Sequence, residues 1–203
     1  MDIQLNLINR SNDANNAQIV IFQKNVAADF DEWLIAWQVI DQLGQGDHYP
    51  FVYPMEMILA ANDSWGNTTP EVTAEDGQLF GVVRTGAGDA IQLQGPATSA
   101  LEVQCRNDLV QGAVNVNLYK SGRLLMTRTG LAPGQVAAFR VAPTLFIAAM
   151  AQMQAGQVMD SAILSSVATE LSLLGIQRAD IVMTGGGPQK APYVFTLDNV
   201  AMA

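Results

Sequence analysis

The residues of this chain that could carry out acid–base chemistry begin with its single histidine. His48 lies in the segment Gly46-Asp47-His48-Tyr49-Pro50, where the neighbouring Asp47 could orient an imidazole for proton transfer. Adjacency in sequence does not make a catalytic triad, however, and the chain contains no Gly-x-Ser-x-Gly nucleophile elbow. Glycine and proline mark the segment as a loop. We therefore expect a structural or surface histidine, predict no catalytic residues, and do not expect an enzyme.

Metal binding is a second chemistry to consider. A single cysteine and a single histidine exclude a Cys/His zinc cage within one chain. The segment Asn62-Asp63-Ser64-Trp65-Gly66-Asn67 offers oxygen ligands and a glycine turn for calcium. It lacks the spacing and the terminal glutamate of an EF-hand, so we predict no metal site and no cofactor. Elsewhere the acids occur in small groups, which is typical of solvated loops.

Aromatic and amide side chains gather between residues 46 and 67. Sugar-binding surfaces combine an exposed aromatic plane with amide and carboxylate hydrogen bonding. This composition predicts a ligand-binding set, with carbohydrate as the candidate ligand. Its members are Asp47, His48, Tyr49, Asp63, Trp65 and Asn67. The alternative is that the aromatic residues cap one end of the fold.

Glycine-rich segments offer no phosphate site. The run Gly185-Gly186-Gly187-Pro188-Gln189-Lys190 lacks the Lys-Ser/Thr pair of a P-loop, and a strand rather than a helix is expected to follow it. We predict a loop between two strands here. Gly86-Ala87-Gly88 is typical of a hairpin turn.

Charge is scarce in this sequence of 203 residues. Charged residues make up 14% and hydrophobic residues 49%, and 10 basic against 19 acidic side chains give a net charge of −9. Nucleic acid and anionic lipid are disfavoured as partners, because both are bound by clustered lysine and arginine. The length is sufficient for a sizeable core without disulfides or metals.

Targeting signals are not apparent in the sequence. The N-terminal residues lack a basic and an apolar region, and the longest apolar run, 145–151, is too short to span a bilayer. The cytoplasm is the default prediction, and extracellular location after non-classical release is the alternative. Cys105 is expected to be a buried thiol.

Period-two alternation dominates the chain and predicts half-buried strands. Together with short apolar runs at 19–22 and 124–126, it predicts strands at residues 3–7, 103–106, 114–119, 136–141, 145–150, 181–184 and 193–200. Ser121-Gly122 lies between two of these runs and predicts a hairpin. Many short strands separated by glycine and proline turns predict an all-β, antiparallel β-sandwich, Ig-like or jelly-roll-like. No composition shift marks a boundary, so a single domain over residues 1–203 is the simpler interpretation.

Two segments are ambiguous. Residues 29–43 place Phe30, Trp33, Leu34, Trp37 and Ile40 on one face of a possible short helix, yet Ile35, Trp37 and Val39 also alternate as in a strand. In both interpretations Trp37 belongs to the core. Residues 160–174 are rich in Ser, Val and Thr, and we expect mostly strand and loop.

Three stretches together resemble a loose group of small, acidic, β-rich microbial proteins that are uncharacterised. They are AQIVIFQKN with AWQVI (17–25 and 36–40), PTLFIAAMAQMQAGQVMDSAILS (143–165), and ADIVMTGGG with YVFTLDNV (179–187 and 193–200). The resemblance implies a sandwich and favours a strand through Trp37. It implies no known activity.

The low charge also suggests a function. Edge lysines are a common means by which β proteins prevent strands from pairing between chains, and residues 141–157 carry no charge at all. If this segment is exposed, it is an assembly surface comprising Leu145, Phe146, Ile147, Met150 and Met153; if it is a buried central strand, no charge is needed. The first hypothesis for function is a self-associating structural protein that forms a filament, layer or inclusion, with itself as partner. The alternative is a carbohydrate- or ligand-binding sandwich.

Overall fold

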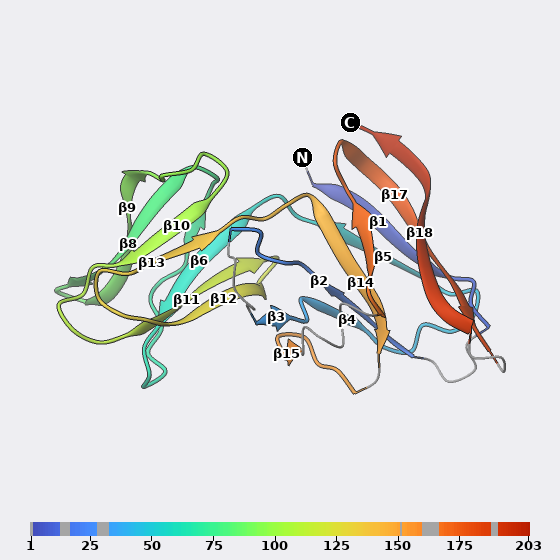
Figure 1. Cartoon of the computed structure of the whole chain (residues 1–203), viewed down its shortest axis with the longest axis horizontal. Helices are drawn as coiled ribbons and strands as arrows, with labels where there is room; N and C mark the ends of the chain where they lie inside the picture. Colours follow the sequence, from blue (N-terminus) through green and yellow to red (C-terminus); the bar gives the residue numbers. More distant parts are fainter. Residues whose placement is uncertain (1, 13–16, 28–32, 151, 160–166, 188–190) are drawn as a thin grey trace. The chain divides into compact units, whose positions relative to one another are not determined.

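Short strands account for most of the structure, which is a computed structural model describing residues 2–12, 17–27, 33–150, 152–159, 167–187 and 191–203 (Figure 1). Strands make up 62% of the chain and helix 1%. The predicted all-β sandwich fold is confirmed. Within the described residues, no helix has the length and apolar character needed to cross a membrane.

The chain folds into two compact units, although its composition suggested one domain. Unit 1 comprises Met1–Gln23, Leu34–Met55 and Pro143–Ala203, and unit 2 comprises Lys24–Trp33 and Glu56–Ala142. Each unit contains two four-stranded sheets. The boundaries fall within continuous chain rather than in a linker of distinct composition, so composition carries no signal of them.

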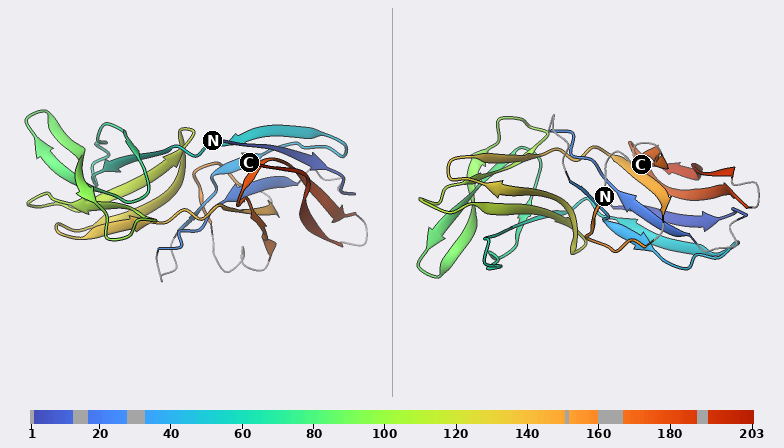
Figure 2. Two further views of the ribbon diagram at one scale, coloured as in Figure 1. Left: turned by 90° about the horizontal axis from the view of Figure 1, so that it is seen from above. Right: turned by 60° about the horizontal axis from the view of Figure 1, so that its bottom comes forward.

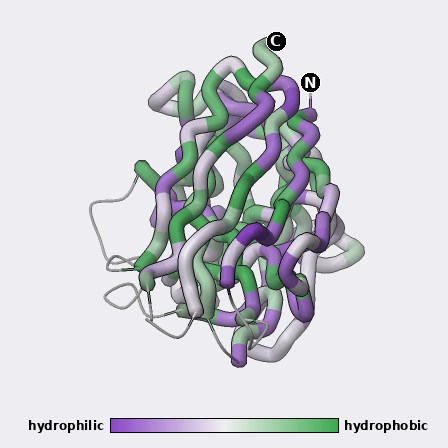
Figure 3. Tube along the Cα trace, turned by 90° about the vertical axis from the view of Figure 1, so that its right-hand side faces the viewer, coloured by the Kyte–Doolittle hydropathy of each residue, from purple (hydrophilic) through white to green (hydrophobic). Residues whose placement is uncertain are grey.

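Unit 1 contains sheets A and B. Sheet A has the order β18 (Ala191–Met202), β17 (Ile176–Gly186), β1 (Ile3–Asn9) and β5 (His48–Tyr53). Sheet B has the order β16 (Thr169–Ser172), β14 (Thr144–Met150), β2 (Gln18–Phe22) and β4 (Gln38–Ile40). β1 pairs in parallel with β17 and antiparallel with β5, so sheet A departs from the purely antiparallel prediction. Along the strands facing the viewer in Figure 3, hydrophobic and hydrophilic residues alternate as period two requires.

Both faces of sheet B are covered. Val20 and Phe22 of β2 pack on one face with Leu34 and Met159, which belong to the small pair β3 (Leu34–Ile35) and β15 (Val158–Met159). The alternate residues of β2 point to the opposite face and are also buried. A strand covered on both faces has no solvent side, which explains the continuous apolar run in β2.

The predicted assembly surface lies on β14, the other central strand of sheet B. Leu145 and Ile147 are completely buried, so the prediction that they form a surface is wrong. Phe146 stacks on Phe22 with 5.4 Å between ring centroids. Met150 and Met153 are partly buried against the same cluster. The middle of the charge-free stretch, at Leu145, Ile147 and Ala148, is therefore core, whereas Gln152 and residues 154–157 are exposed.

The described part of the ambiguous segment contains the short strands β3 and β4 and no helix, and Trp37 lies in the connection between the two strands rather than within one. Residues 28–32 lie outside the described part. Trp37 is 0% exposed and meets Tyr53 edge to face, with centroids 5.8 Å apart. The Tyr53 hydroxyl donates to Gln23 Oε1 at 2.9 Å, and Gln23 Nε2 donates to the Thr144 carbonyl at 2.7 Å. The buried Tyr53 hydroxyl and Gln23 amide are thus satisfied, whereas the buried Gln38 Oε1 of β4 has no hydrogen-bond partner among the described residues. Of residues 160–174, only the part from 167 onward is described, and it includes β16.

Unit 2 contains sheets C and D. Sheet C has the order β12 (Arg123–Leu131), β11 (Val114–Lys120), β6 (Met57–Asn62) and β7 (Val72–Ala74). Sheet D has the order β13 (Val136–Phe139), β10 (Val103–Asn107), β8 (Gln78–Thr85) and β9 (Gly88–Pro96), with β8 and β10 parallel. Figure 2 shows the strands of each sheet from two further directions.

Two predicted hairpins are confirmed in unit 2. β11 and β12 are joined at Ser121-Gly122, whose φ angles of 50° and 68° are those of a type I′ turn. β8 and β9 are joined at the Gly86-Ala87 turn.

Lys120, at the end of β11, is buried although it is charged. Burial raises the pKa of Asp76, and the nearby charge of Lys120 acts in the opposite direction.

The glycine run at the tip of the β17–β18 hairpin is more ordered than the predicted loop. Gly185 and Gly186 belong to β17, Gly186 pairs with Ala191 of β18, and the register shifts between Thr184 and Gly186. Gly185 has a φ of +91°, and a Cβ there would lie 2.1 Å from the carbonyl oxygen of Pro192. Residues 188–190 lie outside the described part.

We expect Trp37→Ala to lower the free energy of unfolding by about 3–5 kcal/mol, because it removes a completely buried indole. Chemical denaturation followed by circular dichroism measures this change. Trp65→Ala, at a position 87% exposed, is the control and should change stability by less than about 0.5 kcal/mol. Equal effects of the two substitutions would contradict the core assignment of Trp37.

Gly185→Ala tests the close approach at the hairpin tip. Its matched control is Gly46→Ala, which has a similar φ of +86° but no atom within 4 Å of the added Cβ. The left-handed conformation costs about 1–2 kcal/mol in both variants. We expect Gly185→Ala to lose a further amount of about 1–3 kcal/mol from the clash with Pro192. Thermal unfolding of both proteins measures the difference, and equal losses would show that the clash relaxes freely.

Candidate functional site

The predicted ligand-binding residues form two groups on different units. Asp47, His48 and Tyr49 belong to unit 1, at and before the start of β5. Asp63, Trp65 and Asn67 belong to unit 2, in the loop that follows β6. Each group is therefore considered separately.

His48 takes part in a polar row across sheet A. Its Nδ1 lies 3.4 Å from Asn6 Nδ2, which also donates to Asp180 Oδ1 at 3.1 Å. Asn199 Nδ2 donates to the other oxygen of Asp180 at 2.6 Å. These hydrogen bonds lower the pKa of Asp180 below its ordinary value, and the bond from Asn199 has the largest effect. The row joins all four strands of the sheet and includes no nucleophile, so its geometry is that of a structural cross-link.

The neighbours of His48 also make structural contacts. Asp47 Oδ2 accepts a hydrogen bond from the backbone N–H of Gly44 at 2.9 Å and so closes a turn. Tyr49 is half-buried, and its ring lies 6.3 Å from that of Phe51, tilted by 41°. This aromatic pair fits the alternative that the aromatic residues cap the fold.

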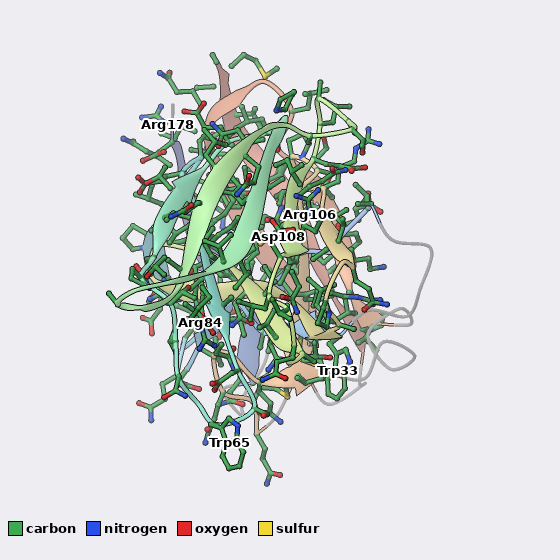
Figure 4. All side chains as sticks on the ribbon, turned by 90° about the vertical axis from the view of Figure 1, so that its left-hand side faces the viewer. Trp33, Trp65, Arg84, Arg106, Asp108 and Arg178 are labelled. Carbon is green, nitrogen blue, oxygen red and sulfur yellow. The ribbon has the colours of Figure 1, made fainter. Side chains whose placement is uncertain are left out.

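The loop after β6 is organised around the carboxylate of Asp63. Its Oδ1 accepts hydrogen bonds from the backbone N–H groups of Trp65 and Asn67, both at 2.9 Å, and its Oδ2 accepts one from Asn67 Nδ2 at 2.8 Å. The Asn67 side chain is the largest cause of the lowered pKa of Asp63. The loop is thus closed by its own carboxylate, and the Trp65 side chain projects from its end into solvent (Figure 4).

A pocket of about 520 Å³ lies beside this loop. β6 and β11 of sheet C and β8 and β9 of sheet D all contribute to it, so it opens between the two sheets of unit 2. Asp63 and Asn67 line it, as predicted for ligand-binding residues; Trp65 lies in the same loop but is not in the lining. Its position between sheets and its size are typical of small-molecule sites.

The sequence did not point to the opposite wall of this pocket. Arg84 of β8 and Asp89 of β9 face each other across the hairpin and form an ion pair through both carboxylate oxygens. Thr68 completes the polar rim. The sequence did hold a signal for this ion pair, since an Arg and an Asp flank the predicted turn Gly86-Ala87-Gly88. Residues on either side of a hairpin turn lie opposite each other.

Cys105 is fully buried, as predicted, and burial raises the pKa of its thiol to about 12. A thiol in this environment is a poor nucleophile. Among the residues that the structure describes, no three His, Cys, Asp or Glu side chains are grouped in a way that could hold a metal ion.

Comparison with known protein families, with curated proteins and with solved structures gives no match to this chain. The resemblance to a group of small acidic β proteins therefore stays a prediction.

Asn67→Ala is expected to raise the pKa of Asp63 toward its ordinary value of 3.8, because it removes the largest hydrogen bond to the ionised form. A carboxyl whose pKa is lowered in the folded state stabilises the loop above the ordinary pKa. That stabilisation is lost as the pH falls through the lowered value. Titration of the Asp63 carboxyl signal by NMR in both proteins measures the change, and an identical pKa in both would show that the Asn67 amide does not act on Asp63.

Proposed function

We propose that the protein is a non-enzymatic, self-associating structural protein whose copies join through the edge strands of their sheets. The main support is the composition of those edges. The four sheets have eight edge strands, and none of these described strands contains a lysine. Since an inward or edge lysine is a common device against pairing between chains, the edges of this protein are poorly protected.

β18 is the edge best suited to pairing. It is the longest strand at 12 residues, and its segment Tyr193–Leu197 carries no charge. Val194, Val200 and Met202 are exposed along it. β16 contacts β18 across the sandwich, but most residues of β18 remain exposed or half-exposed. A long strand with an uncharged stretch of β-branched and aromatic residues is a strong template for addition of another strand.

A second copy of the chain is the partner that fits this edge. Antiparallel pairing of two β18 strands about a two-fold axis at Thr196 sets Asp198 of one copy opposite Val194 of the other, so the like charges do not face each other. A two-fold contact is self-complementary and yields a dimer. β5, at the other edge of sheet A, contains Pro50, which interrupts pairing. Growth beyond a dimer would therefore use the edges of the other sheets.

Thr196→Lys tests this proposal, because it places a charge on the exposed edge of β18. Thr184→Lys is the matched control: it makes the same change of charge at an exposed position on the neighbouring strand β17, which is not an edge. Size-exclusion chromatography with light scattering, together with negative-stain microscopy over a range of concentrations, gives the oligomeric state.

We expect the native protein and Thr184→Lys to associate as concentration rises, and Thr196→Lys to remain monomeric under the same conditions. A native protein that is monomeric at every concentration would overturn the proposal. Association that Thr196→Lys leaves unchanged would overturn the role of β18.

A further inference from the structure

The pocket between sheets C and D of unit 2 has an apolar floor and a polar rim. Ala61, Val82 and Val114 line its depth and are buried. Asp63, Asn67, Thr68, Arg84 and Asp89 line its rim. A ligand that fits must present both apolar surface and several hydrogen-bonding groups. We propose that this pocket binds a neutral saccharide.

The charges at the rim argue against an anionic ligand. Arg84 is the one cationic side chain in the lining, and Asp89 engages it through both oxygens. The formal charge of the lining is −1, because two carboxylates face one guanidinium. A phosphate or carboxylate would meet two carboxylates at the rim and a guanidinium whose charge Asp89 already balances.

The rim groups also retain hydrogen-bonding capacity. Asp63 Oδ2 accepts one hydrogen bond, from Asn67, while a carboxylate oxygen can accept about two. The guanidinium of Arg84 uses two of its five N–H groups on Asp89, and its side chain is 72% exposed. The opening thus offers both acceptors and donors, and a hydroxyl group can both donate and accept. Neighbouring hydroxyls on a sugar ring satisfy such an arrangement without adding charge.

Trp65 supplies an exposed aromatic surface on the loop beside the pocket. Its indole is 87% exposed at the tip of the loop, while Asp63 and Asn67 of the same loop line the pocket. A hydrogen bond from the Trp65 backbone N–H to Asp63 holds the backbone in place. Figure 4 shows it extending beyond Arg84, away from the body of the unit. An exposed aromatic plane next to a polar pocket is suited to the apolar face of a second sugar ring. An oligosaccharide is therefore favoured over a single sugar.

Titration of the isotope-labelled full-length chain by NMR tests this inference. The ligands are cellohexaose, maltohexaose, xylohexaose and chitohexaose, with inorganic phosphate and putrescine as the anionic and cationic comparisons. We expect at least one hexasaccharide to cause saturable shifts of the backbone amides of Asp63, Trp65, Asn67 and Asp89. Neither phosphate nor putrescine should do so.

Two pairs of matched variants locate the site. Arg84→Ala and Trp65→Ala should each weaken binding by about tenfold. Arg106→Ala removes a comparable ion pair, with Asp108, outside the pocket, and Trp33→Ala removes another exposed indole. These two controls should bind as the native protein does. Thermal unfolding of each variant separates loss of binding from loss of fold.

Four results would overturn the inference. The first is that none of the four hexasaccharides shifts these amides, and the second is that phosphate or putrescine alone shifts them. The third is that folded Arg84→Ala binds as tightly as the native protein, and the fourth is that Arg84→Ala and Arg106→Ala lose equal amounts of affinity. Because the monomer carries the pocket, binding is independent of self-association through β18.

Discussion

The parallel pairing of β1 with β17 is the constraint on which the rest of the structure depends. It joins residues near the two ends of the chain, and the bond from Asn6 to Asp180 spans 174 positions. A parallel pair needs a crossover, and here the crossover contains sheet B and all of unit 2. Such a contact is costly in loop-closure entropy, so it persists only because both of its neighbours, β5 and β18, complete a sheet with a buried face.

Burial of sheet B on both faces accounts for much of the unusual composition. Strands covered on one side alternate between apolar and polar residues, whereas β2 and β14 have no solvent side and contain no charge. The small β3–β15 pair, together with Met150 and Met153, supplies the second cover. The absence of charge from β2 and β14 is thus a property of the core, whereas the uncharged residues 152 and 154–157 that follow β14 are exposed.

Two surfaces are available for function, and they differ physically. The edge of β18 offers backbone groups and exposed apolar side chains, which suit another strand of the same kind. The pocket of unit 2 offers fixed carboxylate, amide and guanidinium groups around an apolar floor, which suit a small polar molecule. One surface belongs to each unit, so assembly and ligand binding can be separated by mutation.

Local chemistry was determined by the sequence alone. Alternation located most of the strands, Ser121-Gly122 and Gly86-Ala87 located two hairpins, and the size and apolarity of Trp37 placed it in the core. Asp63 and Asn67 stood out in the sequence as a carboxylate and an amide in a glycine turn, and both line the pocket of unit 2. Only the tertiary structure decided that Leu145 and Ile147 are core, that the chain forms two units, and that Arg84 and Asp89 complete the pocket. The physical reason is that a strand pattern specifies which residues share a face, while the layer that covers this face comes from strands distant in sequence.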